Sequence, residues 1–344
     1  MNRDVQLAAV RGWERVGVFH QRYRRVVPWL AVGLALAAAV VAPLWWLGDY
    51  WQHVFAIAYF YAVLAAGWSL LSGHAGQFSF GHMAFMAIGA YTTGLLGRYL
   101  ELSPWLGIVA GTLMAAVVGL GIGLLVLRLR AAYLALFTIA FSEILRIILR
   151  SEPQITRGDQ GLRVAPLFGD TLSRIPYYYL MLGLLLVCMA LMLWLTRSRV
   201  GLYLRAIRED EDAAAARGVD VVRYKILVFV VTSAMAGLMG TVFAHYTAVL
   251  TPSILVLSQT GLVIAMAILG GVESLVAAAL GGIIVQVGLE LLREFGAWRM
   301  VIFGALLVFT LRFARNGLLA PVLQRILGSG PRVESRREAT PDAT

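Results

Sequence analysis

Side chains that could carry catalysis or hold a metal ion are few and scattered in this sequence. The five histidines lie at positions 20, 53, 74, 82 and 245. The chain contains no HExxH zinc motif, no GxxxxGK phosphate-binding loop and no CxxC pair. His74 and His82, on either side of a glycine-rich turn, could share a metal or could be polar residues of a cavity. We predict no catalytic residue and no metal site.

Charged residues at helical spacing form two candidate pairs. Glu143 and Arg146 are three positions apart, Arg150 continues the same helix face, and Glu290 with Arg293 repeats the spacing. Such pairs either neutralise each other or bind a substrate, because charges inside apolar helices usually serve a purpose. No acidic residue stands clearly unpaired in the middle of an apolar run, which argues against proton or sodium coupling. If the chain moves a solute, the energy would then have to come from outside this chain.

Two glycine-rich stretches, residues 72–90 and 261–288, offer two interpretations. Small residues let helix backbones pack closely in lipid. Alternatively, glycines break helices and expose backbone amides and carbonyls to a polar solute. On the second interpretation, polar and small residues of the first stretch and one acid of a later helix line a substrate path: Ser72, Gly76, Gln77, Ser79, His82 and Glu143.

A charged island, residues 196–225, separates the apolar runs 177–195 and 226–245. Its part 206–217 is rich in Ala, Glu and Arg, which favour helices, and Gly218 follows at a usual helix end. We predict a short surface helix whose small side chains, in residues 213–216, let another backbone approach. It is either a contact element for a cytoplasmic partner or a solvated connector, and composition does not decide between them.

The composition is that of a membrane protein. Of the 344 residues, 60% are hydrophobic and 14% are charged, against about 25% charged in soluble domains. Between positions 29 and 127 the only charges are Asp49, Arg98 and Glu101. The net charge of +10 reflects Lys and Arg beside the apolar runs, which is an orientation signal, so no nucleic-acid partner is expected. A single cysteine, Cys188, excludes an intrachain disulfide.

The apolar runs predict an all-α, polytopic bundle of about ten membrane-spanning helices with both termini cytoplasmic. The domains expected are an N-terminal cytoplasmic segment (1–27), a transmembrane domain (28–315) and a partly disordered cytoplasmic tail (316–344). The expected spans are 28–47, 54–71, one ending near 96, 105–127, 133–149, 177–195, 226–246, 258–271, 275–292 and 300–313.

Two parts of this topology are less regular. The loop 150–176 is expected outside, although it contains several arginines, and its prolines and glycines predict that it has no helix. Segments 258–271 and 275–292 are short and joined by a tight connection, so they could instead form a re-entrant hairpin.

Four stretches of the sequence resemble the membrane-spanning permeases of ABC importers for branched-chain amino acids, the Liv type, and more closely their M-like subunit. They are SGHAGQFSFGHMAFMAIGAYTTGLL (72–96), LRLRAAYLALFTIAFSEILRIIL (127–149), SRVGLYLRAIREDEDAAAARGVDVVRYKILVFVVTSAMAGLMGTV (198–242) and AMAILGGVESLVAAALGG (265–282). The third is the most specific, with matching residues at Gly201, Arg205, Ala206, Ile207, Arg208, Glu209, Ala213, Ala214, Gly218 and Lys225.

This resemblance implies a multi-pass permease subunit of the bacterial inner membrane that is not an enzyme. It would form a heterodimer with a second permease, dock on two cytoplasmic ATPase subunits, and receive solute from an extracytoplasmic binding protein. It would bind no cofactor, since ATP is used by the ATPase. The island would be the coupling loop, with its contacts to the ATPase made by Gly201, Arg205, Ala206, Arg208, Glu209, Asp210, Ala213, Ala214 and Gly218.

One stretch departs from the family pattern. TRGDQGL (156–162) stands where family members often have TGG-type residues, which leaves the contacts to the binding protein open. Related permeases import urea, short amides or aromatic acids, and these solutes remain alternatives. From other classes, an integral membrane transferase would need clustered polar catalytic groups, and a secondary transporter or channel would work without a partner.

Overall fold

The computed structural model describes residues 37–41, 43, 48–126, 131–169, 174–296, 298–314, 317–321 and 323. The chain divides into two units, Met1–Val41 with Pro321–Thr344, and Ala42–Ala320. The helices described below belong to the second unit. The expectations for the segment 1–27, for most of the span 28–47 and for the tail beyond 323 concern residues outside the described ranges.

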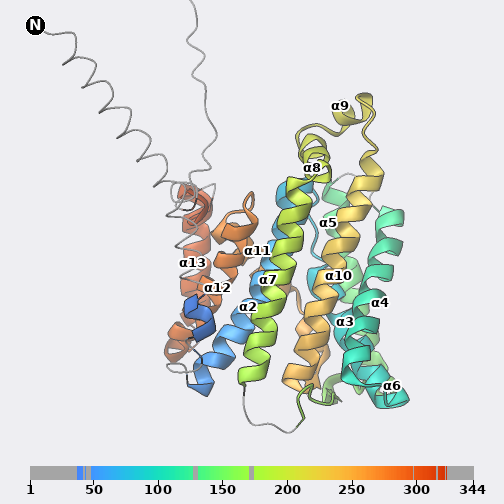
Figure 1. Ribbon diagram of the computed structural model, residues 1–344, viewed down its shortest axis with the longest axis vertical. Coiled ribbons are helices and arrows are strands. Elements are labelled where there is room, and N and C mark those ends of the chain that lie inside the picture. The colour runs from blue at the N-terminus through green and yellow to red at the C-terminus, as the bar shows by residue number, and fades with distance from the viewer. Residues whose placement is uncertain are drawn as a thin grey trace, which may run out of the picture. The chain divides into compact units, whose positions relative to one another are not determined.

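The described apolar runs form long helices, as predicted (Figure 1). They are α2 (Asp49–Ser69), which continues through a π-helical turn, η1 (Leu70–His74), and then α3 (His82–Leu100), α4 (Pro104–Val126), α5 (Ala131–Ser151), α7 (Ile175–Arg197), α10 (Val221–Thr247), α11 (Leu257–Gly270), α12 (Leu275–Leu291), with the short η4 (Leu292–Phe295) after it, and α13 (Trp298–Phe313). Among the described residues, five helical stretches are long and apolar enough to cross a membrane: Asp49–His74, Pro104–Val126, Ile175–Arg197, Val221–Thr247 and Leu275–Phe295. The chain is an all-α helical membrane protein.

Helix α2 is the most enclosed of these five stretches. Of the most apolar window in the stretch Asp49–His74, 83% is buried, against 28% for α4. Helices α7, α10, α11 and α12 all contact α2. Its alanines permit this approach: a Cβ at Gly282 of α12 would lie 2.9 Å from the Cα of Ala62. Close backbone approach through small residues is the usual way helices associate in lipid.

Helices α3, α4 and α10 also cross at glycines. A Cβ at Gly89 of α3 would lie 2.2 Å from the carbonyl oxygen of Gly237 in α10. A Cβ at Gly111 of α4 would lie 2.6 Å from the carbonyl oxygen of Gly89. A Cβ at Gly240 of α10 would lie 1.9 Å from the carbonyl oxygen of Met86 in α3. The packing interpretation of the glycine-rich stretches is therefore correct for residues such as Gly89.

Two non-helical segments interrupt the bundle. Residues 76–81, which we call the non-helical segment, join η1 to α3. They return along α2, because His82 lies beside Gly67, whose Cβ would be 3.7 Å from the histidine Nε2. The second interruption joins α10 to α11 and contains β2 (Val249–Leu250) and η3 (Pro252–Leu255). Leu255 is buried in one cluster with Tyr91 and Leu149.

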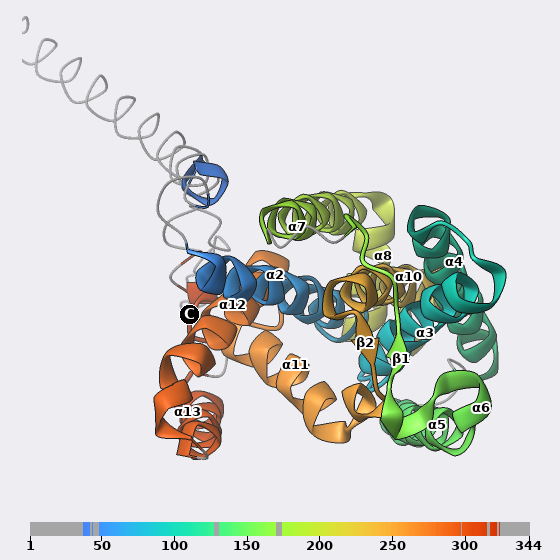
Figure 2. The same cartoon turned by 90° about the horizontal axis from the view of Figure 1, so that it is seen from below.

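The loop 150–176 is more ordered than predicted. Within it lie α6 (Pro153–Thr156), η2 (Gly158–Gln160) and β1 (Leu162–Arg163). The prediction that its prolines exclude a helix is wrong, because Pro153 occupies the first turn of α6, where a missing N–H costs nothing. Strand β1 pairs with β2 in antiparallel fashion, Leu162 opposite Leu250 (Figure 2).

The charged island is helical but differs from the predicted single helix over 206–217. It contains α8 (Arg199–Glu209) and α9 (Glu211–Ala216), and it lies at the end of the bundle opposite α6 (Figure 1). The helix breaks at Asp210, which has an extended backbone (φ −159°) and whose carboxylate accepts hydrogen bonds from the N–H groups of Asp212 and Ala213, both at 3.0 Å. This is an N-cap, for which Asp is among the preferred residues. Gly218 has φ +83° and follows the end of α9, close to the predicted helix end.

Candidate functional site

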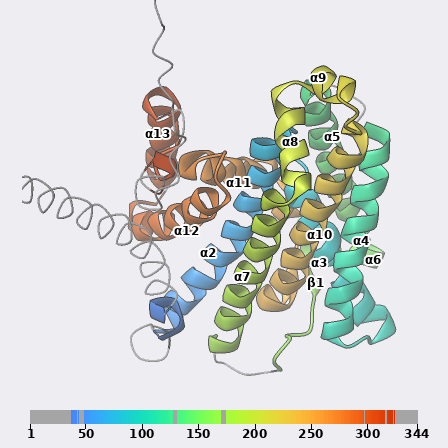
Figure 3. The same ribbon diagram turned by 45° about the horizontal axis from the view of Figure 1, so that its top comes forward.

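Helix α8 is amphipathic and is held against the bundle by one face. Leu204 and Ile207 are buried, while Arg205, Ala206 and Glu209 are exposed. Ser198 caps the start of the helix by accepting a hydrogen bond from the N–H of Val200, at 3.2 Å. The helix therefore presents a charged face outward at this end of the bundle, which Figure 3 turns towards the viewer.

Gly201 permits the sharp corner between α7 and α8. A Cβ at this position would lie 2.1 Å from the carbonyl oxygen of Thr196, a distance that no side chain tolerates. Gly201 is buried, so the structure places it in the corner and away from the exposed face.

Helix α9 is held against α10 by an ion pair. The side chain of Lys225, 7% exposed, forms an ion pair with Glu211. The ring centroids of Tyr203 in α8 and Tyr224 in α10 are 4.9 Å apart. Ala214 is buried, and Ala213 is exposed. The two short helices and the start of α10 therefore form one connected element.

Arg208 is the residue through which α8 reaches the rest of the bundle. Its Nη1 donates a hydrogen bond to the carbonyl oxygen of Gly73 in η1, at 2.5 Å, and its Nη2 forms an ion pair with Glu273. Glu273 lies in the α11–α12 turn (residues 271–274). Sequence reasoning missed this link, because no local spacing connects positions so far apart in the chain.

The non-helical segment is anchored mainly through its backbone. Trp68 donates its indole N–H to the carbonyl of Ser79, at 2.9 Å, and Phe80 donates its N–H to the Thr138 hydroxyl of α5, at 2.9 Å. The N–H of Gln77 bonds to the carbonyl of Leu71, at 3.0 Å. Unwound backbone in a membrane needs such partners, because lipid supplies none. The polar Thr138 in an apolar run was the available sequence signal for this contact.

The structure brings five of the six predicted path residues together. Ser72 lies in η1, Gly76, Gln77 and Ser79 in the non-helical segment, and His82 at the first position of α3. Gly76 is exposed, Ser72 is half-buried, and the other three are buried. The side chain of Gln77 is 2% exposed, and its amide has no hydrogen-bond partner among the described residues.

The two histidines of this region have different neighbours. His74 contacts the carbonyl of Ser69 through Nδ1, at 3.4 Å, and His82 packs against Gly67. Among the described residues, no group of three or more His, Cys, Asp or Glu side chains could hold a metal ion.

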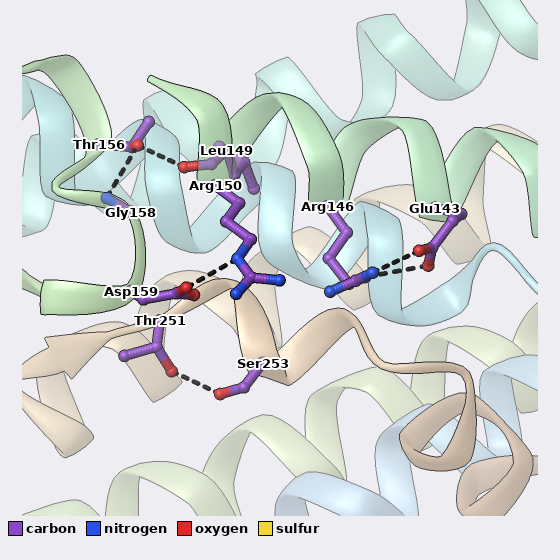
Figure 4. Close-up of polar contacts among 9 residues, drawn as sticks. All are labelled: Glu143, Arg146, Leu149, Arg150, Thr156, Gly158, Asp159, Thr251 and Ser253. Atoms are coloured by element: carbon purple, nitrogen blue, oxygen red, sulfur yellow. Dashed lines mark hydrogen bonds and ion pairs between the residues drawn. The ribbon is translucent and has the colours of Figure 1, made fainter. Parts of the chain in front are cut away.

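Glu143, the sixth path residue, lies on α5 beside Arg146 (Figure 4). Two hydrogen bonds of 2.5 and 3.0 Å join this ion pair, which confirms that the two residues share a helix face. One turn further, Arg150 binds Asp159 of η2 at 2.7 Å. The predicted pair of Glu290 and Arg293 is also present, at 3.1 Å.

Comparison of the sequence with known proteins identifies its family. Residues 51–311 match the family model described as the permease component of branched-chain amino acid transport systems. The chain is 35% identical over 287 residues to the LivM permease of the high-affinity branched-chain amino acid transport system of Escherichia coli (strain K12), covering 75% of this chain and 67% of that relative.

More distant relatives follow. The LivH permease of Salmonella typhimurium (strain LT2) is 24% identical over 292 residues, which are 77% of this chain and 93% of that protein. The nucleoside ABC transporter permease NupC of Lactococcus lactis is 25% identical over 193 residues, 51% of this chain and 61% of that protein. No solved structure matches the chain.

The family match spans α2 to most of α13 and so includes the non-helical segment, α5 and the connected element of α8 and α9. Members of this family are transport components and not enzymes, in agreement with the absence of catalytic motifs in the sequence. The chain belongs to the family of permease components of branched-chain amino acid transport systems.

Proposed function

We propose that this chain is one of two permease subunits of an ATP-driven importer that moves branched-chain amino acids across the bacterial inner membrane. The observation that carries the proposal is the connected element of α8 and α9, held at one end of an apolar bundle in the region of the family match. The second permease resembles LivH, two ATPase subunits lie in the cytoplasm, and a binding protein delivers the solute from the other side.

The exposed face of α8 and α9 is the docking surface for the ATPase. Arg205, Ala206, Glu209 and Ala213 are exposed on it, and the left-handed Gly218 ends it. The buried Leu204 and Ile207 hold the helix on the bundle, so that pressure on the exposed face moves a packed element and not a free loop. The chain itself binds no cofactor, since ATP is hydrolysed by the partner.

The proposed topology has about ten spans with both termini cytoplasmic. The arginines of the charged island support it, because an excess of Lys and Arg marks the cytoplasmic side. The end of the bundle that contains α6, η2 and β1 then faces outward and meets the binding protein.

The substrate path runs along the non-helical segment and the charged face of α5. A zwitterionic amino acid needs polar groups for its ammonium and carboxylate, and the path offers the free amide of Gln77 and the pair of Glu143 and Arg146. Each charged side chain of that pair is partly exposed, at 46% and 24%. An amino acid can therefore approach either charge without entering the packed core.

Replacing Gln77 with Leu separates a role in the path from a structural one. A buried amide without partners destabilises a fold, so its removal is expected to leave stability unchanged or raise it. Uptake is expected to fall by about tenfold, because one good polar contact is worth roughly 1–1.5 kcal/mol. Thermal unfolding in detergent and uptake kinetics measure the two effects. Unchanged uptake would remove Gln77 from the path.

The function is tested by producing the chain with a second permease, an ATPase and a binding protein. Affinity purification in mild detergent is expected to recover the ATPase and the second permease. In proteoliposomes, labelled leucine is expected to enter only with ATP and binding protein. Urea, short amides, aromatic acids and nucleosides serve as competing solutes. Uptake at full rate by the purified chain alone would contradict the proposal.

A further inference from the structure

Arg208 joins three elements that are far apart in the chain. It lies near the end of α8, and its guanidinium contacts the Gly73 carbonyl of η1 and the Glu273 carboxylate of the α11–α12 turn. Its side chain is 33% exposed, so most of it is covered by the bundle. Unlike the exposed Arg205 and Glu209, Arg208 therefore directs its charge to partners within the bundle.

The backbone of α8 also touches the non-helical segment at this point. A Cβ at Gly76 would lie 3.5 Å from the Cα of Arg208, and Gly76 has φ +67°. Gly76 begins the segment whose Gln77, Ser79 and Phe80 follow at once. A displacement of α8 at Arg208 therefore acts directly on the start of the non-helical segment.

The two turns that Arg208 contacts are themselves joined. The hydroxyl of Ser69 donates to the carbonyl oxygen of Val272, at 2.7 Å. A Cβ at Gly73 would lie 1.9 Å from the same oxygen, so the backbones of η1 and the α11–α12 turn are in contact. These turns come from the two halves of the chain, and Arg208 bonds to both.

We propose that Arg208 is the positioning residue that transmits movement of α8 to the non-helical segment and to the α11–α12 turn. This inference rests on the proposed function of α8 as the contact with an ATPase. Arginine suits the task, because its planar guanidinium holds two acceptors at a fixed separation. Lysine, with a single ammonium on a flexible stem, would hold one acceptor at a time.

The bond to Glu273 contributes little to folding. The Glu273 side chain is 69% exposed, and exposed ion pairs contribute little to stability. The hydrophobic contacts of Leu204 and Ile207 keep α8 in place without it. Without the Arg208 side chain, the complex should still assemble. Movement of α8 should then no longer be transmitted to the non-helical segment and the α11–α12 turn.

The experiment compares Arg208→Ala, Arg208→Lys and the control Arg197→Ala, which alters an exposed arginine at the end of α7, outside the docking surface. Each is made in the full importer complex in proteoliposomes. Arg208→Ala is expected to assemble and hydrolyse ATP, but to move about tenfold less leucine per ATP, a typical size for coupling between sites. Arg208→Lys should be intermediate, and Arg197→Ala should match the unaltered complex.

A second measurement does not depend on the solute. With Cys188 replaced by Ala, Phe78→Cys places a thiol on the exposed part of the non-helical segment, where Phe78 is 37% exposed. ATP is expected to change the rate of thiol labelling in the unaltered background and not with Arg208→Ala. The charge exchange Arg208→Glu with Glu273→Arg should restore part of the ATP effect.

The outcomes separate the two proposals. If the unaltered complex moves no leucine but ATP still changes labelling through Arg208, the solute assignment fails and the inference stands. If Arg208→Ala prevents assembly, Arg208 is a docking or folding residue, and the inference is wrong. It is equally wrong if transport per ATP and ATP-dependent labelling in Arg208→Ala match those of Arg197→Ala.

Discussion

At the scale of single residues, glycine shows how one residue type serves different purposes here. Gly89, Gly237 and Gly240 lie where helix backbones touch, while Gly288 has no atom within 4 Å of its would-be Cβ. Gly76 and Gly218 instead have positive φ angles, +67° and +83°. The sequence does not distinguish these glycines from one another, because the space for a side chain at each position depends on tertiary contacts.

Adding one methyl group distinguishes these glycines. Gly89→Ala would place a carbon against the Gly237 backbone, and overpacking of this kind costs about 1–3 kcal/mol. Gly288→Ala, in open space within α12, should be neutral or stabilising by about 0.5–1 kcal/mol, because alanine favours helix. Thermal unfolding in detergent measures both. Equal melting temperatures would contradict the assigned crossing of α3 and α10.

Polar contacts at residue scale were predictable only where they are local. The pair of Glu143 and Arg146 follows from a spacing of three residues on one helix. The bonds of Arg208 to Gly73 and Glu273 have no such spacing. Helical periodicity predicts neighbours within an element, whereas contacts between elements depend on how the helices pack.

At the scale of elements, the sequence predicted the long helices well and the short ones poorly. Apolar runs such as 105–127 and 177–195 correspond closely to α4 and α7, because length and hydropathy decide what can cross a membrane. The single helix expected over 206–217 divides into α8 and α9, because the Asp210 side chain competes for backbone N–H groups. Helix propensity summed over a window does not register such a cap.

The cap at Asp210 predicts a local effect. Asp210→Ala removes the acceptor for the N–H groups of Asp212 and Ala213, a loss of about 1 kcal/mol, equivalent to roughly fivefold faster amide exchange at those positions. Asp210→Asn should keep the cap and exchange as the unaltered chain does. Hydrogen–deuterium exchange with mass spectrometry checks this. Equal acceleration by both substitutions would point to lost charge and not to a lost cap.

At the scale of the whole described bundle, the two ends carry different structural features. One end holds the charged face of α8 and α9 (Figure 1), and the other holds α6, η2 and the pairing of β1 with β2 (Figure 2). His245 stabilises the end that contains α6. It contacts the Thr93 hydroxyl at 2.9 Å and the carbonyl oxygen of Ala165 at 2.6 Å. The arginines of the sequence indicated two sides of the membrane, but no sequence pattern predicted the contacts of His245, which join α10 to α3 and to the loop 150–176.

The proposed topology predicts opposite accessibility for the two ends. In a chain with Cys188 replaced by Ala, a cysteine at Arg217 should react with an impermeant thiol reagent only from the cytoplasmic side, and one at Asp159 only from outside. Both positions are exposed, so burial does not limit their labelling. Right-side-out and inverted membrane vesicles provide the comparison. Labelling of both cysteines from one side would overturn the assignment.

The central place of α2 has a consequence for biosynthesis. Helix α2 is made early, yet its neighbours α10 and α12 come from the second half of the chain. Its His53 contacts the hydroxyl of Tyr246 in α10, and its Ser69 donates a hydrogen bond to the carbonyl oxygen of Val272 in the α11–α12 turn. During translation these two polar groups lack their partners until the later part of the chain has been made. Chains that stop before α10 should therefore be recognised by membrane quality control and degraded.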